Sequence, residues 1–305
     1  MPKSPLKVIP LGGLGEIGKN MLVLEYADDI IVIDAGVMFP GEESPGIDLI
    51  IPDTSYLLEN RSKVRGIVIT HGHEDHTGAL PFVVRQLDVP IYAPRLAEGL
   101  ISVKLREHKV LKGTKLQVVA PGDRLNLGAF EVEMFRVCHS IPDSMGLVIR
   151  TPIGTVVHTG DFKLDHTPVD GRPSDFSKLA KMGSQGVLLL LSDSTYAELP
   201  GYTPSEKVVS ATLDTIMGGA QGRVIIATFA SLVSRVQQVI DAAVKHNRKV
   251  SVVGRSMVGT VGMATDLGYL DIPEGTLVGL EELGRLPHGR VTIIITGTQG
   301  EPSSA

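Results

Sequence analysis

Three histidines and one aspartate lie within six residues in the segment His71-Gly-His73-Glu-Asp75-His76. Imidazole nitrogens and carboxylate oxygens are the ligands that zinc and manganese take in proteins. Because His71 and His73 alternate along the chain, they can converge on one ion, while Asp75 and His76 turn toward a second. A solvated histidine-rich turn is the alternative interpretation. The concentration of ligand types favours a metal site.

Two further candidate ligands follow predicted strands. His139 comes after the predicted strand 130–137, and Asp161 comes after the predicted strand 155–158. A carboxylate between two cations can bridge them, and we assign that position to Asp161. A lone histidine or aspartate at a strand end is more often structural, but the cluster at 71–76 reverses that expectation.

Three neighbouring residues have weaker claims on this chemistry. Asp34 ends a predicted strand and could hydrogen-bond a metal-ligating histidine, although a turn aspartate is an equal alternative. His158 could support the site by orienting a ligand through its ring N–H. Cys138 stands beside His139 and could ligate a metal, but we favour its interpretation as a small buried hydrophobic side chain.

A pair of metal ions would define the class of reaction. Two cations ~3.5–4 Å apart lower the pKa of a bridging water to near neutrality and stabilise charge on a phosphoryl or acyl oxygen. The site therefore predicts hydrolysis of an ester, an amide or a phosphodiester. Metal ligation alone does not choose among these bonds.

The elements that must position these residues begin as strands. Apolar runs at 7–11, 20–26 and 30–34 are separated by a few polar residues and no helix, so an antiparallel start is expected. A buried strand at 66–70 ends directly in His71. A helix is predicted over 77–87, with Pro81 near its first turn. The apolar run 186–191 has the length of a buried strand.

The pattern changes after about residue 203. Helices are predicted at 207–217, 231–245 and 257–267, and strands at 223–227, 249–253 and 291–296. This alternation is typical of a parallel sheet with helices outside. We therefore expect one domain over 1–205 and a second over 206–305.

One motif suggests a nucleotide site that the context does not support. Gly13-Leu-Gly15-Glu-Ile-Gly18 matches G-x-G-x-x-G, which requires a following helix to meet the phosphate. The residues that follow it, Met21–Tyr26, are strand-like. A tight hairpin turn close to the active centre is the preferred interpretation.

Composition narrows the class of protein. The chain has 305 residues and a formal charge of −5, all of it within residues 1–205, so bulk charge gives no support for nucleic-acid binding. A single cysteine favours a reducing, cytoplasmic compartment. No apolar run approaches the ~18–20 residues of a membrane span, so no membrane partner is expected.

The H-x-H-x-D-H segment followed by His139 and Asp161 resembles the metallo-β-lactamase superfamily. Leu190-Leu-Ser-Asp193-Ser-Thr195 resembles the acidic motif that opens the β-CASP insertion of its nucleic-acid-processing members. Two later segments resemble internal β-CASP motifs: Ala227-Thr-Phe-Ala-Ser231-Leu-Val-Ser-Arg235 and Thr296-Gly-Thr-Gln-Gly-Glu-Pro302. With residues 10–20, they are similar to the ribonuclease J family over nearly the whole chain.

The resemblance implies an α/β (α+β) fold, with a four-layer αβ/βα sandwich over 1–205 and a partial parallel-sheet β-CASP domain over 206–305. It implies two zinc ions, with manganese as the alternative. His71, His73 and His139 would hold the first ion, Asp75 and His76 the second, and Asp161 would bridge them.

The resemblance also implies a function and further site residues. Asp75, Asp161 and Asp193 would be the catalytic carboxylates, and Ala230, Ser231 and Leu232 would bind RNA phosphate. The implied activity is a ribonuclease that acts from RNA 5′ ends, with internal cleavage as a second activity, in RNA maturation and decay. A homo-oligomer and RNA-degradation partners would be expected of the full-length protein.

In this family the chain returns to the first domain and supplies two more histidines, one of them for the second zinc. Those positions lie beyond residue 305, so we expect a weaker second metal site and an impaired activity for these 305 residues alone. Two alternatives stay open: a small-molecule thioesterase or lactonase with the same metal core, and a non-catalytic RNA-binding fragment.

Overall fold

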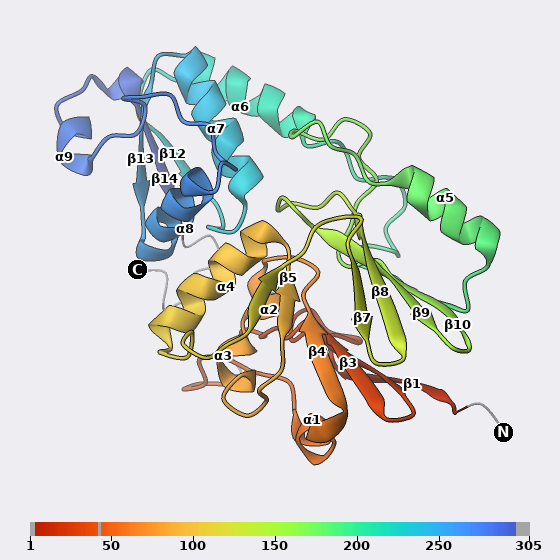
Figure 1. The fold of residues 1–305 in the computed structure, drawn as a ribbon. Helices are drawn as coiled ribbons and strands as arrows, with labels where there is room; N and C mark the ends of the chain where they lie inside the picture. The colour runs from red at the N-terminus through yellow and green to blue at the C-terminus, as the bar shows by residue number, and fades with distance from the viewer. Residues whose placement is uncertain (1–3, 42–43, 297–305) are drawn as a thin grey trace. The chain divides into compact units, whose positions relative to one another are not determined.

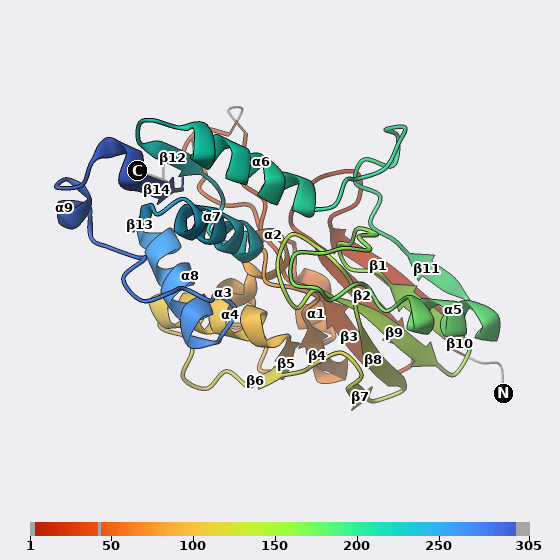
Figure 2. The same cartoon turned by 90° about the horizontal axis from the view of Figure 1, so that it is seen from above.

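The computed structural model describes residues 4–41 and 44–296 (Figures 1 and 2). The chain divides into two compact units. The first consists of Met1–His139, Asp143–Lys163 and Ser174–Pro200, and the second of Ser140–Pro142, Leu164–Pro173 and Gly201–Ala305. These units interleave along the sequence, so the simple boundary predicted between residues 205 and 206 stays a prediction.

The first unit begins with a six-stranded sheet. In spatial order its strands are β1 (Leu6–Gly12), β2 (Met21–Tyr26), β3 (Asp29–Ile33), β4 (Val64–Val68), β5 (Ile91–Ala93) and β6 (Leu116–Val118). Strands β1 to β3 pair antiparallel and β3 to β6 pair parallel. The predicted antiparallel start is confirmed.

A second sheet of the same unit has five strands. They are β7 (Arg124–Leu127), β8 (Phe130–Arg136), β9 (Met145–Thr151), β10 (Gly154–His158) and β11 (Leu189–Leu191). The prediction of a buried strand at 186–191 is wrong in one respect. β11 is an edge strand paired only to β10 in this sheet. Leu189 and Leu191 pack against the core, whereas Leu190 on the opposite face and Leu188 before the strand are 59% and 55% exposed.

Alternation of side chains explains how the two sheets stack. In β3, Ile30 and Val32 face the cluster that contains the helices, whereas Ile31 and Ile33 pack against the second sheet. In β8, Met134 joins the cluster between the sheets, while Phe135 joins a third cluster with Met182 of α5. Both sheets are therefore apolar on both faces, and the four-layer αβ/βα order of the prediction is confirmed.

The outer layers are helical (Figure 1). The helices of this unit are α1 (Ser55–Glu59), α2 (Glu74–Thr77), α3 (Leu80–Val83), α4 (Arg95–Glu107) and α5 (Phe176–Gln185), with a 3₁₀ turn at Arg61–Lys63. The helices α1, α3 and α4 pack against the first sheet through Leu57, Leu80 and Ile101, respectively. None of the helices in the described residues is long and apolar enough to span a membrane.

The continuous helix predicted over 77–87 is wrong. The chain forms two short helices, α2 and α3, which are separated by Gly78 and Ala79. Pro81 has no N–H to donate to the carbonyl of Thr77, so a helix that began at Thr77 would lack this hydrogen bond, whereas in the first turn of α3 proline is tolerated. At Gly78 a Cβ would lie 2.6 Å from the carbonyl oxygen of Glu74 and from Val37, so the bend needs glycine.

The second unit alternates helices and strands as predicted. It contains α6 (Lys207–Gly219), β12 (Val224–Ala227), α7 (Val233–Lys245), β13 (Lys249–Val253), α8 (Arg255–Asp266), α9 (Leu280–Leu283), a 3₁₀ turn at His288–Arg290, and β14 (Val291–Ile295). The strands pair parallel in the order β12-β14-β13. The motif at 296–302 lies outside the described residues after Thr296.

Candidate metal centre

The loop after β4 gathers the first group of candidate ligands. His71 is fully buried just past the strand, and His73 precedes the first residue of α2. His73 Nδ1 lies 3.0 Å from His71 Nε2 and 3.2 Å from His139 Nε2. One nitrogen from each ring falls within 4.8 Å of the other two. The structure thus brings together the three predicted histidines of the first metal.

A second group shares His71 with the first. His71, His76 and Asp161 each place a ligand atom within 4.8 Å of the others. Asp161 Oδ2 lies 3.3 Å from His76 Nε2, 3.8 Å from His139 Nε2 and 4.0 Å from His71 Nε2. This carboxylate therefore faces histidines of both groups, the position expected of a bridge. Asp75 Oδ2 lies 3.5 Å from His76 Nε2.

Asp34 and Thr70 form hydrogen bonds with the Nδ1 atoms of His76 and His71. The Thr70 hydroxyl donates to Asp34 Oδ2 at 2.9 Å, so it accepts from His71 Nδ1, which lies 3.0 Å away. His76 Nδ1 lies 2.8 Å from Asp34 Oδ2 and donates to it. Both rings therefore carry a proton on Nδ1, and the Nε2 atom of each ring faces the other candidate ligands. The predicted contact of Asp34 with a candidate ligand histidine is present.

Backbone contacts fix α2 relative to two loops. The N–H groups of Ala35 and Val37 donate to the carbonyls of His76 and Glu74 at 2.8 and 3.1 Å, and the Asn20 N–H donates to Asp75 O at 3.0 Å. A Cβ at Gly36 would stand 1.5 Å from the Asp75 carbonyl oxygen. Only glycine permits this approach, which sets the position of the Asp75 and His76 side chains.

Burial controls the charge of the first group. Desolvation lowers the pKa of His71 well below its ordinary value, that of His73 to about 3 and that of His139 to about 4. The neighbouring imidazoles push the pKa values of His71 and His73 in the same direction. These rings are therefore neutral near pH 7 and offer lone pairs, which is the form that binds a cation.

In the second group, the pKa of His76 shifts in the opposite direction to that of His71. Burial lowers the pKa of His76, but the nearby carboxylates Asp34 and Asp161 outweigh it and raise that pKa well above its ordinary value. Burial opposes ionisation of Asp161, but hydrogen bonding to His76 brings its pKa down to about 2. Nitrogen and carboxylate donors around one centre fit zinc or manganese.

Asp193 lies beside the bridge position without joining the cluster. Its carboxylate accepts from Thr195 N–H at 2.8 Å and from Phe162 N–H at 3.5 Å, and its own N–H donates to Thr159 Oγ1 at 3.0 Å. Thr159 and Phe162 flank Asp161 in sequence, so Asp193 braces the loop that carries it. Among the described contacts, none joins Asp193 to the six candidate ligands.

His158 and the turn Ala230–Leu232 are the remaining predicted site residues. His158 ends β10, and its Nδ1 accepts from the Gly160 N–H at 3.1 Å, while burial lowers its pKa. Its support of a ligand through a ring N–H stays a prediction.

Ala230, Ser231 and Leu232 form the turn between β12 and α7 in the second unit. Phosphate binding at this turn also stays a prediction.

Sequence reasoning missed Thr70 and the side chain of Asn20. The Asn20 amide group lies 3.3 Å from Asp75 Oδ2 and 3.1 Å from His76 Nε2. Its position at the end of the glycine-rich loop was the available signal. The loop joins antiparallel strands β1 and β2, so the interpretation as a hairpin turn near the site, with no dinucleotide helix, is confirmed.

Comparisons with known proteins agree with this geometry. Residues 14–197 match the metallo-beta-lactamase superfamily, and residues 221–305 match the ribonuclease J beta-CASP domain. Ribonuclease J of Thermus thermophilus is 50% identical over 310 residues, which cover 99% of this chain and 54% of the relative. Ribonuclease J of a Synechocystis species is 50% identical over 302 residues, with coverages of 98% and 47%.

The chain spans about half the length of these two relatives. A crystal structure of a protein of unknown function from Enterococcus faecalis V583 has a TM-score of 0.71, covering 97% of this chain and 82% of that chain. At 17% identity it shows the fold alone. Together with the stacked sheets and the histidine cluster, these findings confirm the predicted resemblance. The chain belongs to the metallo-β-lactamase superfamily and is similar to ribonuclease J along nearly its whole length.

Proposed function

We propose that this chain carries the metal centre of a ribonuclease that hydrolyses RNA phosphodiesters. One observation carries the proposal: Asp161 faces histidines of two ligand groups in a chain that is 50% identical to proteins named ribonuclease J. The proposed activity removes nucleotides from RNA 5′ ends, with internal cleavage as a second activity. Its roles would be RNA maturation and decay.

Two zinc ions, or manganese in their place, are the proposed cofactors. His71, His73 and His139 would hold the first ion, Asp75 and His76 the second, and Asp161 both. When bound, such a pair supplies a water of lowered pKa and stabilises charge on the scissile phosphate. Asp34 and Thr70 keep the outer protons on His76 and His71, which orients both rings for ligation.

The chain's own groups would complete the site. Asp75, Asp161 and Asp193 are the proposed catalytic carboxylates, with Asp193 acting through the loop it braces. The turn Ala230–Leu232 is the proposed phosphate contact, because it precedes the N-terminus of the 13-residue helix α7. Asp34 and His158 would support the ligands. Residues 1–205 would form the metal-binding domain and 206–305 the β-CASP domain.

The wider setting is part of the same proposal. RNA would be the substrate, with other copies of the chain and components of an RNA-degradation complex as partners. A cytoplasmic location fits that substrate and a chain whose single cysteine, Cys138, forms no internal disulfide.

The test joins metal content to product analysis. Purified protein is assayed by elemental analysis and incubated with a 5′-monophosphorylated, 3′-labelled RNA and, separately, with a thioester. We expect bound zinc or manganese and shortening of the RNA from its 5′ end. Asp161→Asn should lose this activity, and Glu59→Gln, which alters an exposed carboxylate on α1, should keep it. Thioester turnover with intact RNA would favour a small-molecule hydrolase, and metal without any turnover would favour an RNA-binding module.

A further inference from the structure

Exposed cations gather where α4 ends and the chain runs on to β6. Residues 84–115 contain seven Lys and Arg but three Asp and Glu, within a chain of net charge −5. Six of these cations are exposed. Arg95 lies at the start of α4, and the other five, Arg85, Arg106, Lys109, Lys112 and Lys115, lie toward its end. We call these five residues the basic corner.

Few of these charges are neutralised. Lys115 pairs with Asp88 at 3.2 Å, but both side chains are more than half exposed, so the pair contributes little. Arg85 donates to the carbonyl of His108 at 3.1 Å and keeps its charge. Within residues 4–41 and 44–296, no ion pair involves Arg106, Lys109 or Lys112. The corner therefore presents a net positive surface.

The loop that carries the two central lysines is ordered. After α4, Lys109 adopts a left-handed φ of 59° and Gly113 a φ of 99°, which turn the chain twice. The N–H groups of Val110 and Leu111 both donate to the Leu105 carbonyl, at 2.9 and 3.2 Å. Lys109 and Lys112 are thus presented on a fixed backbone, which reduces the entropy lost when they bind a ligand.

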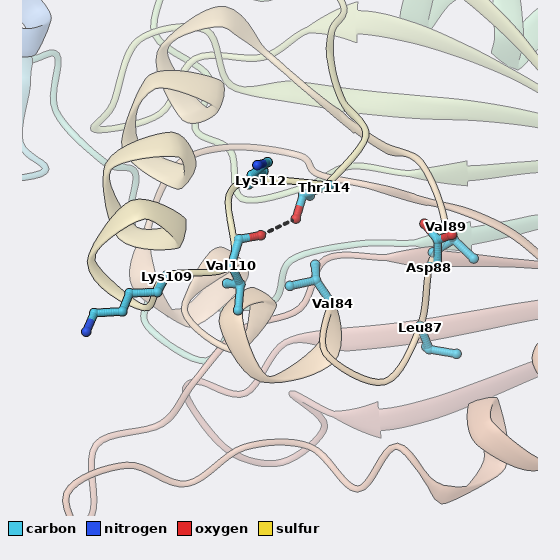
Figure 3. A pocket seen from close by; sticks show the side chains of 9 residues that line it. Val84, Leu87, Asp88, Val89, Lys109, Val110, Lys112 and Thr114 are labelled. Carbon is cyan, nitrogen blue, oxygen red and sulfur yellow. Dashed lines mark hydrogen bonds between the residues drawn. The ribbon is translucent and has the colours of Figure 1, made fainter.

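Beneath the lysines lies a hollow of about 310 Å³ (Figure 3). Its apolar lining comes from four residues: Val84, Leu87, Val89 and Val110. Asp88, Lys109, Lys112 and Thr114 line it as well. The Asp88 carboxylate pairs with Lys115, and the ammonium of Lys109 extends outward from the hollow (Figure 3). Leu87 and Val89 are buried, so the apolar surface open to a ligand comes from the half-buried Val84 and Val110. A nucleotide could place its sugar or base against these two side chains while its phosphates meet the ammonium groups.

Helix α4 connects this corner to the metal loop. Lys104, in its last two turns, contacts the carboxylate of Glu74, which stands between His73 and Asp75 in sequence. Lys109 follows Lys104 by five residues and lies two residues beyond the end of α4. The ring of His108 also packs edge-on against Phe82 at 5.5 Å. A polymer bound at the metal loop could therefore reach the corner on the same unit.

We propose that the basic corner binds the phosphate backbone of single-stranded RNA outside the metal centre, with one nucleotide in the hollow. This inference rests on the proposed function, because it assigns a second contact to the same substrate. The rest of residues 1–205 is strongly acidic and repels a polyanion. The corner thus concentrates backbone contacts at Lys109 and Lys112.

The test measures salt-dependent binding to metal-loaded protein. The ligand is a fluorescent 5′-monophosphorylated RNA of about 16 nucleotides, within the span of common single-strand sites, made with phosphorothioate linkages that resist hydrolysis. Lys109→Gln with Lys112→Gln is compared with a control pair, Arg61→Gln with Lys181→Gln, which removes two exposed cations elsewhere on the unit. Circular dichroism checks that both variants fold.

We expect the slope of log K against log salt to become shallower by about 1.4 for the Lys109/Lys112 variant, at ~0.7 per lost cation. The control pair should keep the parental slope, and an RNA of about 4 nucleotides should bind both variants like the parent. An unchanged slope with the long RNA overturns the corner but leaves the ribonuclease proposal intact. If the Lys109/Lys112 variant bound RNA like the parent but no longer bound a polyglutamate peptide that the parent binds, the surface would be assigned to an acidic protein. No RNA binding or cleavage by the parent would overturn both proposals.

Discussion

Replacing Gly36 with alanine should disable the metal centre through the backbone alone. The Gly36 N–H donates to Asn20 O at 2.9 Å, and its neighbours Ala35 and Val37 donate to carbonyls of α2. An added Cβ would stand 1.5 Å from Asp75 O, whereas a carbon and a carbonyl oxygen normally approach to ~3.3 Å. The loop and α2 must therefore separate by about 2 Å.

A displacement of that size has two expected costs. Overpacking of a closed site lowers the free energy of unfolding by about 1–3 kcal/mol. A 1 Å misplacement of reacting groups can lower the rate about 100-fold, so a larger shift of Asp75 and His76 should lower RNA cleavage at least that much. The second ion should also be lost, because α2 carries both of its own candidate ligands.

The assay compares Gly36→Ala with a matched glycine replacement. Gly183 lies within α5 with no atom within 4 Å of an added Cβ, so Gly183→Ala should raise stability by about 0.5–1 kcal/mol and leave metal content unchanged. Chemical denaturation of metal-free protein gives stability, and elemental analysis gives bound metal. If Gly36→Ala retained two ions and parental cleavage, the assignment of a backbone support to this loop would be refuted.

Three further outcomes are expected. Asp34→Asn should weaken metal affinity about 10–100-fold in a chelator competition while the fold persists, since the support of His76 is altered. Burial opposes ionisation of Glu133, but Lys178 and Arg150 lower its pKa from 4.5 to about 2. The resulting stability, up to ~3 kcal/mol, should be present above pH 4.5 and disappear between pH 4.5 and 2, and Glu133→Gln should remove this dependence in urea titrations. Removal of metal by a chelator should lower the melting temperature, and titration with zinc should raise it again.

The proximity of the candidate ligands could be predicted because each follows a strand. His71, His139 and Asp161 come soon after β4, β8 and β10, and the structure places them within one cluster. The short spacing from His71 to His76 fixed the rest of the group. Local sequence was sufficient here, since the ligands are either adjacent in the chain or mark the ends of core strands.

Other features depend on tertiary contacts that local patterns do not contain. The contact of Asn20 with Asp75 joins residues 55 apart, and nothing in the strand pattern indicates it. The apolar residues of β11 are compatible with a central strand and with an edge strand, so the sequence does not indicate its place in the sheet. The helix predicted over 77–87 is divided before Pro81, which has no N–H to continue the hydrogen bonds of α2 and begins a new helix instead.

Asp34 shows why this site needs a particular residue at a costly backbone position. Its φ of 62° is left-handed, a conformation that glycine adopts more readily. Yet its carboxylate binds the Thr70 N–H at 2.7 Å, the Thr70 hydroxyl and His76 Nδ1, which glycine could not do. Asparagine tolerates the backbone but would present an amide N–H₂ or a neutral oxygen to the histidine. Only aspartate combines a tolerated left-handed turn with two anionic acceptors, so the strained backbone is retained for the contacts with Thr70 and His76.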